Sequence, residues 1–274
     1  MFKPQAFKNV ILLLALAFVT IGHLGRAEAR QPQQRTGILL VHGWAGDSTA
    51  WSGVEAELRG AGAAIDLPGH GADNSDVSGW SVADFARRLE QERQRRGIAC
   101  LVLGAHSNGS FVAREYARRY PQRLGAIVVV EGTFVKPFRD SEQFRAFRSR
   151  LDTGWAEVVR RPPGLVNASE ATQRSVRAMF ERTRKATALA TLDMLAHDSF
   201  WAEDQVRVPV TFIWAESPTW TAEHRERLAR IAPRSRFVQA GGVSHYAQLD
   251  RPALVAAELR AARGSARCGR RSRH

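Results

Sequence analysis

The sequence is poor in cysteine, which occurs only twice in 274 residues. Cys100 lies in an apolar, strand-like run and Cys268 in a basic C-terminal stretch, so their placement does not indicate a disulfide framework. We expect a buried thiol at Cys100 and a thiol in a loose tail at Cys268. The chain also lacks a repeat of fixed period and a long polar tract, which excludes a repeat architecture and a largely disordered protein.

Acidic residues are scarce relative to basic ones. The 27 Asp and Glu residues against 40 Lys and Arg residues give a formal net charge of +13, which favours non-specific contact with anionic surfaces. The arginines, however, are spread along helix-like segments such as residues 85–97, where they are typical of a solvated helix face. No nucleic-acid-binding motif accompanies the charge, so we expect no nucleic-acid partner. We expect residues 264–274 to form a basic, disordered tail.

The longest apolar run of the chain starts at Val10 and lies within the N-terminal part of the sequence. Two lysines precede this run, and the residues Ala-Glu-Ala at 27–29 match the small-x-small pattern of a cleavage site. The alternative is a membrane anchor, but the run is short for a span and no basic stop-transfer cluster follows it. We therefore expect residues 1–29 to be a secretory signal peptide and the mature protein to be exported, periplasmic or extracellular, without a membrane span.

Apolar runs typical of buried strands alternate with segments of helical spacing through most of the chain. The predicted strands lie at 36–43, 63–71, 98–107, 124–132, 208–216 and 236–242. This alternation predicts an α/β fold, a mostly parallel twisted sheet with helices on both faces. It is interrupted over residues 135–205, which are Arg-rich and helical in pattern. The predicted organisation is a core of residues 30–134 and 206–263, with a helical cap at 135–205.

The stretch "GAHSNGS" marks the sharpest predicted turn, because a buried strand runs directly into a helix there. Such a strand-to-helix bend needs small residues two positions before and after its central serine, and Ala105 and Gly109 satisfy this around Ser107. The alternative is a serine that only caps the helix, but the strand before and the helix after favour a nucleophile. The backbone N–H of Asn108, at the helix N-terminus, is then placed to bind a developing oxyanion.

A second oxyanion donor and a general base are needed for this serine to react. The run "LLVHGWAG" ends the first predicted strand, and the backbone N–H of Trp44 is expected to point into the same cleft as Ser107. Among the histidines, His245 follows the last predicted strand and precedes the final helix. We therefore predict Trp44 and Asn108 as the oxyanion hole and His245 as the base.

Four motifs in this order carry a resemblance to a known family: "VHGWAGDSTAW", "DLPGHG", "GAHSNGS" and "GVSHYAQLDRP". With them, residues 36–263 resemble the α/β-hydrolase superfamily. The resemblance implies that fold, a serine nucleophile at Ser107 and a helical cap over the site. Only a few residues separate the predicted signal from the first strand, so the N-terminal strands of larger relatives are expected to be missing.

The acid of the predicted site departs from the usual pattern of that family. Most members carry it after the strand that matches "VPVTFIW", where this chain has Ala215-Glu216-Ser217-Pro218. Glu131 ends the preceding strand, as in a branch of the superfamily that includes one haloalkane dehalogenase group. We prefer Glu131 and keep Glu216 as the alternative acid. Dehalogenase chemistry is not implied, because Ser107 occupies the position of the aspartate nucleophile.

The predicted function is hydrolysis of a small or medium carboxylic ester through an acyl-enzyme, with a small-molecule substrate and no metal or organic cofactor. Two alternatives remain: a cofactor-free perhydrolase or acyltransferase with the same residues, and a binding protein that has lost turnover. Aromatic residues in and near the cap are candidates to line the pocket: Phe134, Phe138, Trp155, Phe180, Trp201 and Trp220.

Overall fold

The computed structural model describes residues 35–196, 201 and 204–269, which belong to one compact unit that starts at residue 34. The predicted signal peptide, residues 1–29, lies outside the described residues and stays a prediction. Within the described part of the chain, no helix combines the length and the apolar character needed to cross a membrane.

The core of this unit is a six-stranded sheet in the order β2-β1-β3-β4-β5-β6, with every neighbouring pair parallel. The strands are β1 (Thr36–Val41), β2 (Gly62–Ile65), β3 (Cys100–His106), β4 (Leu124–Val130), β5 (Val210–Ala215) and β6 (Ser235–Ala240). Every residue of β3 and β4 is buried. The near-continuous apolar runs of these strands are what a sheet covered on both faces requires.

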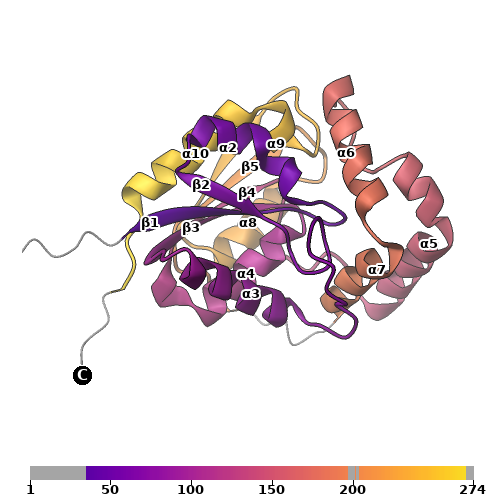
Figure 1. Ribbon diagram of the computed structural model, residues 1–274, viewed down its shortest axis with the longest axis horizontal. Coiled ribbons are helices and arrows are strands. Elements are labelled where there is room, and N and C mark those ends of the chain that lie inside the picture. The colour runs from indigo at the N-terminus through magenta and orange to yellow at the C-terminus, as the bar shows by residue number, and fades with distance from the viewer. Residues whose placement is uncertain (1–34, 197–200, 202–203, 270–274) are drawn as a thin grey trace, which may run out of the picture. The chain divides into compact units, whose positions relative to one another are not determined.

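Helices cover both faces of the sheet (Figure 1). Those that share an apolar core with one face are α3 (Val82–Arg95), α4 (Gly109–Arg119) and α8 (Ala222–Ile231). Those that share a core with the other face are α2 (Ser52–Leu58), α9 (Ala247–Asp250) and α10 (Pro252–Ser265). Along β3 the side chains alternate between these cores, with Leu101 and Leu103 on the first and Val102 on the second. Two short 3₁₀ turns, η1 (Ser48–Trp51) and η2 (Pro121–Arg123), complete the core.

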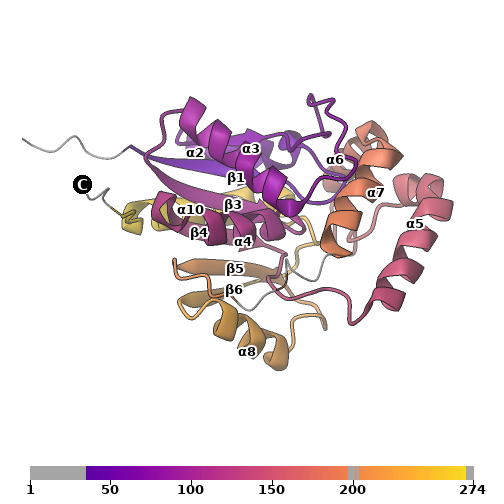
Figure 2. The same ribbon diagram turned by 90° about the horizontal axis from the view of Figure 1, so that it is seen from below.

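The predicted helical cap is present between β4 and β5. It consists of α5 (Ser141–Arg160), α6 (Glu170–Arg182), α7 (Lys185–Asp193) and the short η3 (Met194–Ala196). Two helices follow residue 168 rather than one, because Thr183 adopts an extended conformation that ends α6. The helices α5, α6 and α7 lie together beyond one end of the strands, as two perpendicular views show (Figures 1 and 2).

Polar contacts fasten the cap to the core. Asp47, which is 3% exposed, pairs with Arg182 of α6 at 2.6 Å between Oδ2 and Nη2. The Trp44 indole N–H donates to the carbonyl of Ala188 in α7, with 2.8 Å between the atoms. The hydroxyl of Thr183 donates to the carbonyl of Ala45 at 3.1 Å. The segment after β1 is thus held by the cap as well as by the sheet.

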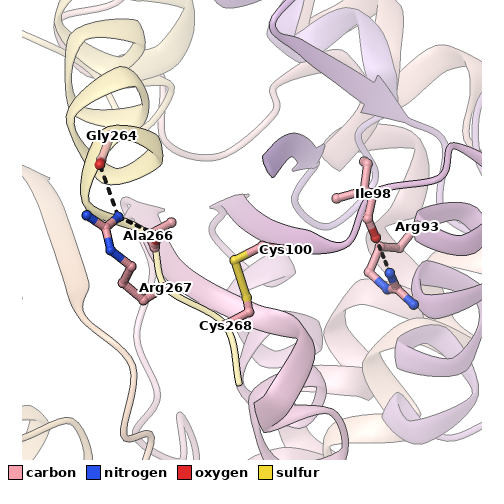
Figure 3. The surroundings of a disulfide bond; sticks show 7 residues. All are labelled: Arg93, Ile98, Cys100, Gly264, Ala266, Arg267 and Cys268. Carbon is pink, nitrogen blue, oxygen red and sulfur yellow. Dashed lines mark hydrogen bonds between the residues drawn. A yellow bond between two sulfur atoms is a disulfide. The ribbon is translucent and has the colours of Figure 1, made fainter. Parts of the chain in front are cut away.

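The expectation of two free thiols is wrong, because Cys100 and Cys268 form a disulfide with 5.5 Å between their Cα atoms (Figure 3). Of the expected tail at residues 264–274, the first two residues belong to α10, which ends at Ser265. The physical reason is the course of α10, which packs along the sheet and returns the chain to the start of β3. There both the Ala266 side chain and the Cys100 sulfur lie close to Gly125, since a Cβ on Gly125 would be 2.7 Å from the first and 2.9 Å from the second. The bond closes a separation of 168 residues, which sequence spacing does not reveal.

Replacing both cysteines in Cys100→Ser/Cys268→Ser is expected to lower the free energy of unfolding by about 2–4 kcal/mol, since the cross-link restricts the unfolded chain. Urea unfolding with and without a phosphine reductant measures the effect. The reductant should destabilise the native protein and leave the double variant unchanged. Equal stability of the two proteins under oxidising conditions would contradict a structural role for the bond.

Candidate active site

Ser107 lies in a sharp turn between β3 and α4. Its φ is +49°, in the left-handed region that non-glycine residues rarely adopt, while its N–H still donates to the carbonyl of Val130 on β4. The turn needs glycine two residues later: a Cβ on Gly109 would lie 2.6 Å from the carbonyl oxygen of His42. The predicted strand–turn–helix around Ser107 is therefore the local geometry that the structure contains.

His245 lies between β6 and α9, and its imidazole bridges two groups. Its Nε2 is 2.9 Å from the Ser107 hydroxyl oxygen, and its Nδ1 is 3.2 Å from Oε2 of Glu131. A carboxylate only accepts hydrogen bonds, so Nδ1 carries the proton and Nε2 is left to accept from the serine hydroxyl. Three residues separated along the chain are brought into one hydrogen-bonded series in the order Ser107, His245, Glu131.

The two candidate acids occupy different environments. Glu131 directly follows β4 with a φ of +49° and is 5% exposed. Its Oε1 accepts from the backbone N–H of Ala215 at 2.5 Å and from the indole N–H of Trp220 at 3.2 Å. Glu216 is exposed at the cavity wall, and within the described residues it makes no hydrogen bond or ion pair with His245. The carboxylate at the histidine is therefore that of Glu131.

The backbone of Trp44 lies next to the Ser107 turn. A Cβ added to Gly43 would lie 3.0 Å from the Ser107 Cβ, so the segment directly after β1 abuts the serine. Trp44 and Asn108 both line the cavity that contains Ser107. Among the described residues, neither of their backbone N–H groups donates to a protein acceptor. Both amides are thus available to an oxygen atom bound beside the serine.

Three other histidines hold loops in place. His42 accepts from the N–H of Leu67, and His106 Nε2 lies 2.8 Å from the carbonyl oxygen of His245. Burial lowers the pKa of His42 and lowers that of His106 well below its ordinary value, so both rings are neutral and the His106 N–H donates to that carbonyl. Burial also lowers the pKa of His70, to about 3. These rings position backbone, which leaves His245 as the histidine at the serine.

The cavity has a volume of about 700 Å³ and is walled by both core and cap. Of the six predicted aromatic lining residues, Phe138, Phe180 and Trp220 line it. The other three are not part of its wall: Phe134 is 0% exposed in the core, Trp155 packs against Trp44 and Phe180, and Trp201 packs on Phe111. Sequence reasoning missed Phe147, which lies on α5 and faces the cavity.

A cap loop between α5 and α6 contacts the histidine itself. The carbonyl of Gly164 accepts from the His245 N–H at 3.1 Å, and the Tyr246 hydroxyl donates to the carbonyl of Pro163 at 3.4 Å. Gly164 has a φ of +83°, and a Cβ there would lie 2.6 Å from the Cβ of His245. In the sequence this loop is the stretch "RPPG" at residues 161–164, a helix-breaking pattern that carries no sign of a contact with His245. Within the described residues no group of His, Cys, Asp and Glu is arranged to hold a metal ion.

Comparison with known proteins identifies the family. The model of the alpha/beta hydrolase family matches residues 38–258, which is most of the chain, so the protein belongs to that family. The fold and the sequence resemblance are thereby confirmed.

Individual relatives are more distant. An uncharacterized protein of Mycobacterium tuberculosis (strain ATCC 25618 / H37Rv) is 35% identical over 95 residues, 34% of this chain and 28% of that protein. A 2-succinyl-6-hydroxy-2,4-cyclohexadiene-1-carboxylate synthase of Enterobacter sp. (strain 638) is 30% identical over 46% of this chain and 48% of the synthase. The matches thus span about half or less of these curated relatives. A thermophilic esterase from Thermogutta terrifontis superimposes with a TM-score of 0.65 at 25% identity, covering 83% of this chain and 90% of the esterase.

Gly164→Ala is expected to slow the reaction of Ser107 with a fluorophosphonate by about tenfold or more, because the added Cβ displaces His245 from the serine. The measurement is the labelling rate at fixed pH. Gly154→Ala is the matched control: a Cβ at Gly154, in the cap helix α5, meets nothing within 4 Å. Its labelling rate should equal that of the wild type. Equal rates for both variants would show that the cap loop does not set the position of His245.

Proposed function

We propose that the protein is a serine hydrolase that cleaves a small or medium carboxylic ester through an acyl-enzyme. The observation that carries the proposal is the series of hydrogen bonds from the Ser107 hydroxyl through His245 to the Glu131 carboxylate. A serine hydroxyl next to an imidazole, which is itself oriented by a buried carboxylate, is the arrangement that activates a hydroxyl for attack.

The proposed reaction has two halves. Ser107 attacks the ester carbonyl carbon while His245 takes its proton, and His245 then gives that proton to the leaving alcohol as the C–O bond breaks. Water attacks the resulting acyl-enzyme with His245 again as the base, which releases the acid. Glu131 keeps the proton on Nδ1 and stabilises the imidazolium in both halves. The N–H groups of Trp44 and Asn108 bind the negative oxygen of each tetrahedral intermediate.

The cavity wall favours an uncharged substrate. Aromatic and aliphatic side chains form most of it, including Phe138, Phe147 and Phe180. The charged side chains among the described lining residues are two carboxylates, those of Glu131 and Glu216. A substrate carboxylate beside them would be repelled. This disfavours the chemistry named for the Enterobacter relative, whose product is a carboxylate, and supports a neutral ester.

Export from the cytoplasm belongs to the same proposal. The disulfide between Cys100 and Cys268 supports it, because such bonds persist in oxidising compartments such as the periplasm. Together with the predicted signal at residues 1–29, this suggests that the hydrolase acts on esters outside the cytoplasm.

The decisive experiment combines turnover with labelling. The wild type should release p-nitrophenol from p-nitrophenyl butyrate with a burst, and Ser107→Ala should lower kcat by about a thousandfold or more. A fluorophosphonate adduct should map to the peptide that contains Ser107. An adduct on another residue would refute the site, and no release from a series of acyl chain lengths would favour a binding protein.

The products of the reaction identify the molecule that accepts the acyl group. Adding hydrogen peroxide or an alcohol to the assay and quantifying acid, peracid and new ester separates a hydrolase from a perhydrolase or acyltransferase. For a hydrolase, acid should remain the main product.

Substrate charge provides a further prediction. Between p-nitrophenyl pentanoate and the p-nitrophenyl monoester of glutaric acid, which differ mainly by a terminal carboxylate, kcat/KM should favour the neutral ester by about tenfold. Glu216→Gln should reduce that ratio, since it removes one of the two negative charges at the wall. A ratio that is reversed in the wild type would contradict a neutral substrate class.

A further inference from the structure

Two tryptophans contact the turn that carries Glu131. Trp214 lies in β5 and Trp220 in the loop after it, and their indole rings stack in parallel with centroids 4.4 Å apart and an interplanar angle of 1°. The Trp214 indole N–H donates to the carbonyl of Gly132 at 3.1 Å, and the Trp220 indole N–H donates to Oε1 of Glu131. The stacked pair therefore holds both the backbone after the acid and the acid itself.

The two oxygens of the Glu131 carboxylate have separate partners. Oε1 accepts from the Ala215 N–H and the Trp220 indole, and Oε2 faces His245 Nδ1. Rotation about the last side-chain bond of a glutamate is soft, so the plane of the carboxylate is set by what its oxygens bind. With Oε1 fixed by two donors, Oε2 is left at the one position where it meets the imidazole.

We propose that Trp220 is a positioning residue that acts through Glu131: its indole N–H, braced by the stack on Trp214, orients the carboxylate toward His245. This inference rests on the proposed function of the Ser107 site and adds a residue to it. Trp220 also lines the cavity, so the simpler alternative is that it only contacts substrate. The two roles differ in what they change. Loss of a wall contact raises KM, whereas a misdirected carboxylate lowers kcat.

If Trp220 orients the carboxylate, the loss of kcat on replacing Trp220 also depends on the presence of Glu131. A group that acts only through a carboxylate has little left to do once that carboxylate is replaced, so the two substitutions should not be additive. Glu131→Gln is the suitable replacement because it keeps the shape of the side chain and removes its charge.

The test uses Trp220→Phe, which keeps a ring to stack on Trp214 and removes the N–H. We expect kcat for p-nitrophenyl butyrate to fall about tenfold with KM changed less than about twofold, the size typical of groups that orient a catalytic side chain. In the Glu131→Gln background, Trp220→Phe should lower kcat by less than about twofold. Trp80→Phe is the control, since Trp80 packs edge-on against Phe85 and is not among the lining residues; it should not change kcat.

A rise in KM alone, or the same fall in kcat with and without Glu131, would overturn the inference. If Trp220→Phe does not fold, Trp220→His and Trp220→Met decide the question, because both are smaller than Trp and only histidine donates; histidine should retain the higher kcat. The rate of phosphonylation of Ser107 is measured in parallel. It reports the activation of the serine without an ester substrate, so a failed proposed function remains distinguishable from a failed role of Trp220.

Discussion

The site depends on two parallel strands that end level with one another. β3 and β4 are paired in register up to His106 and Val130, and the next residue on each strand, Ser107 and Glu131, has a φ of +49°. Each of these turn residues still donates its N–H to the neighbouring strand, Ser107 to β4 and Glu131 to β5. The sheet therefore fixes the proposed nucleophile and the proposed acid through backbone hydrogen bonds before any side chain is considered. Strain at these positions is tolerated because the surrounding sheet determines them.

The imidazole of His245 lies between these two residues, but its backbone belongs to the loop after β6, an edge strand of the sheet. The carbonyl of His245 is held by His106, the last residue of β3 before the serine turn. The N–H of His245 is held by the carbonyl of Gly164 in the cap. The imidazole is thus located by the core from one side and by the cap from the other. The cap therefore contributes to the cavity wall and also contacts the backbone that carries His245.

Local patterns predicted the sheet, the Ser107 turn and the helical insertion, because each depends on residues that are close in sequence. Apolar runs indicated the strands, small residues indicated the turn, and helical spacing indicated the insertion. Contacts between distant segments were not predictable in that way. The Cys100–Cys268 bond depends on the direction in which α10 leaves the sheet, and the contact of Gly164 with His245 depends on how the cap packs. The choice of acid stayed open for the same reason, since a sequence does not show which carboxylate reaches Nδ1. Trp220 was expected at the cavity, which it lines, but the acceptor of its N–H was invisible.

The backbone and the carboxylate of Glu131 lie at the ends of two different strands. The backbone of Glu131 follows the end of β4, yet its Oε1 accepts from the N–H of Ala215, the last residue of β5. The charged group therefore lies at the end of β5, which is where most members of the family attach the acid. Moving the residue by one strand changes the backbone that carries it and leaves the carboxylate beside the imidazole. Glu216, directly after β5, lines the cavity instead, and its charge acts on whatever enters.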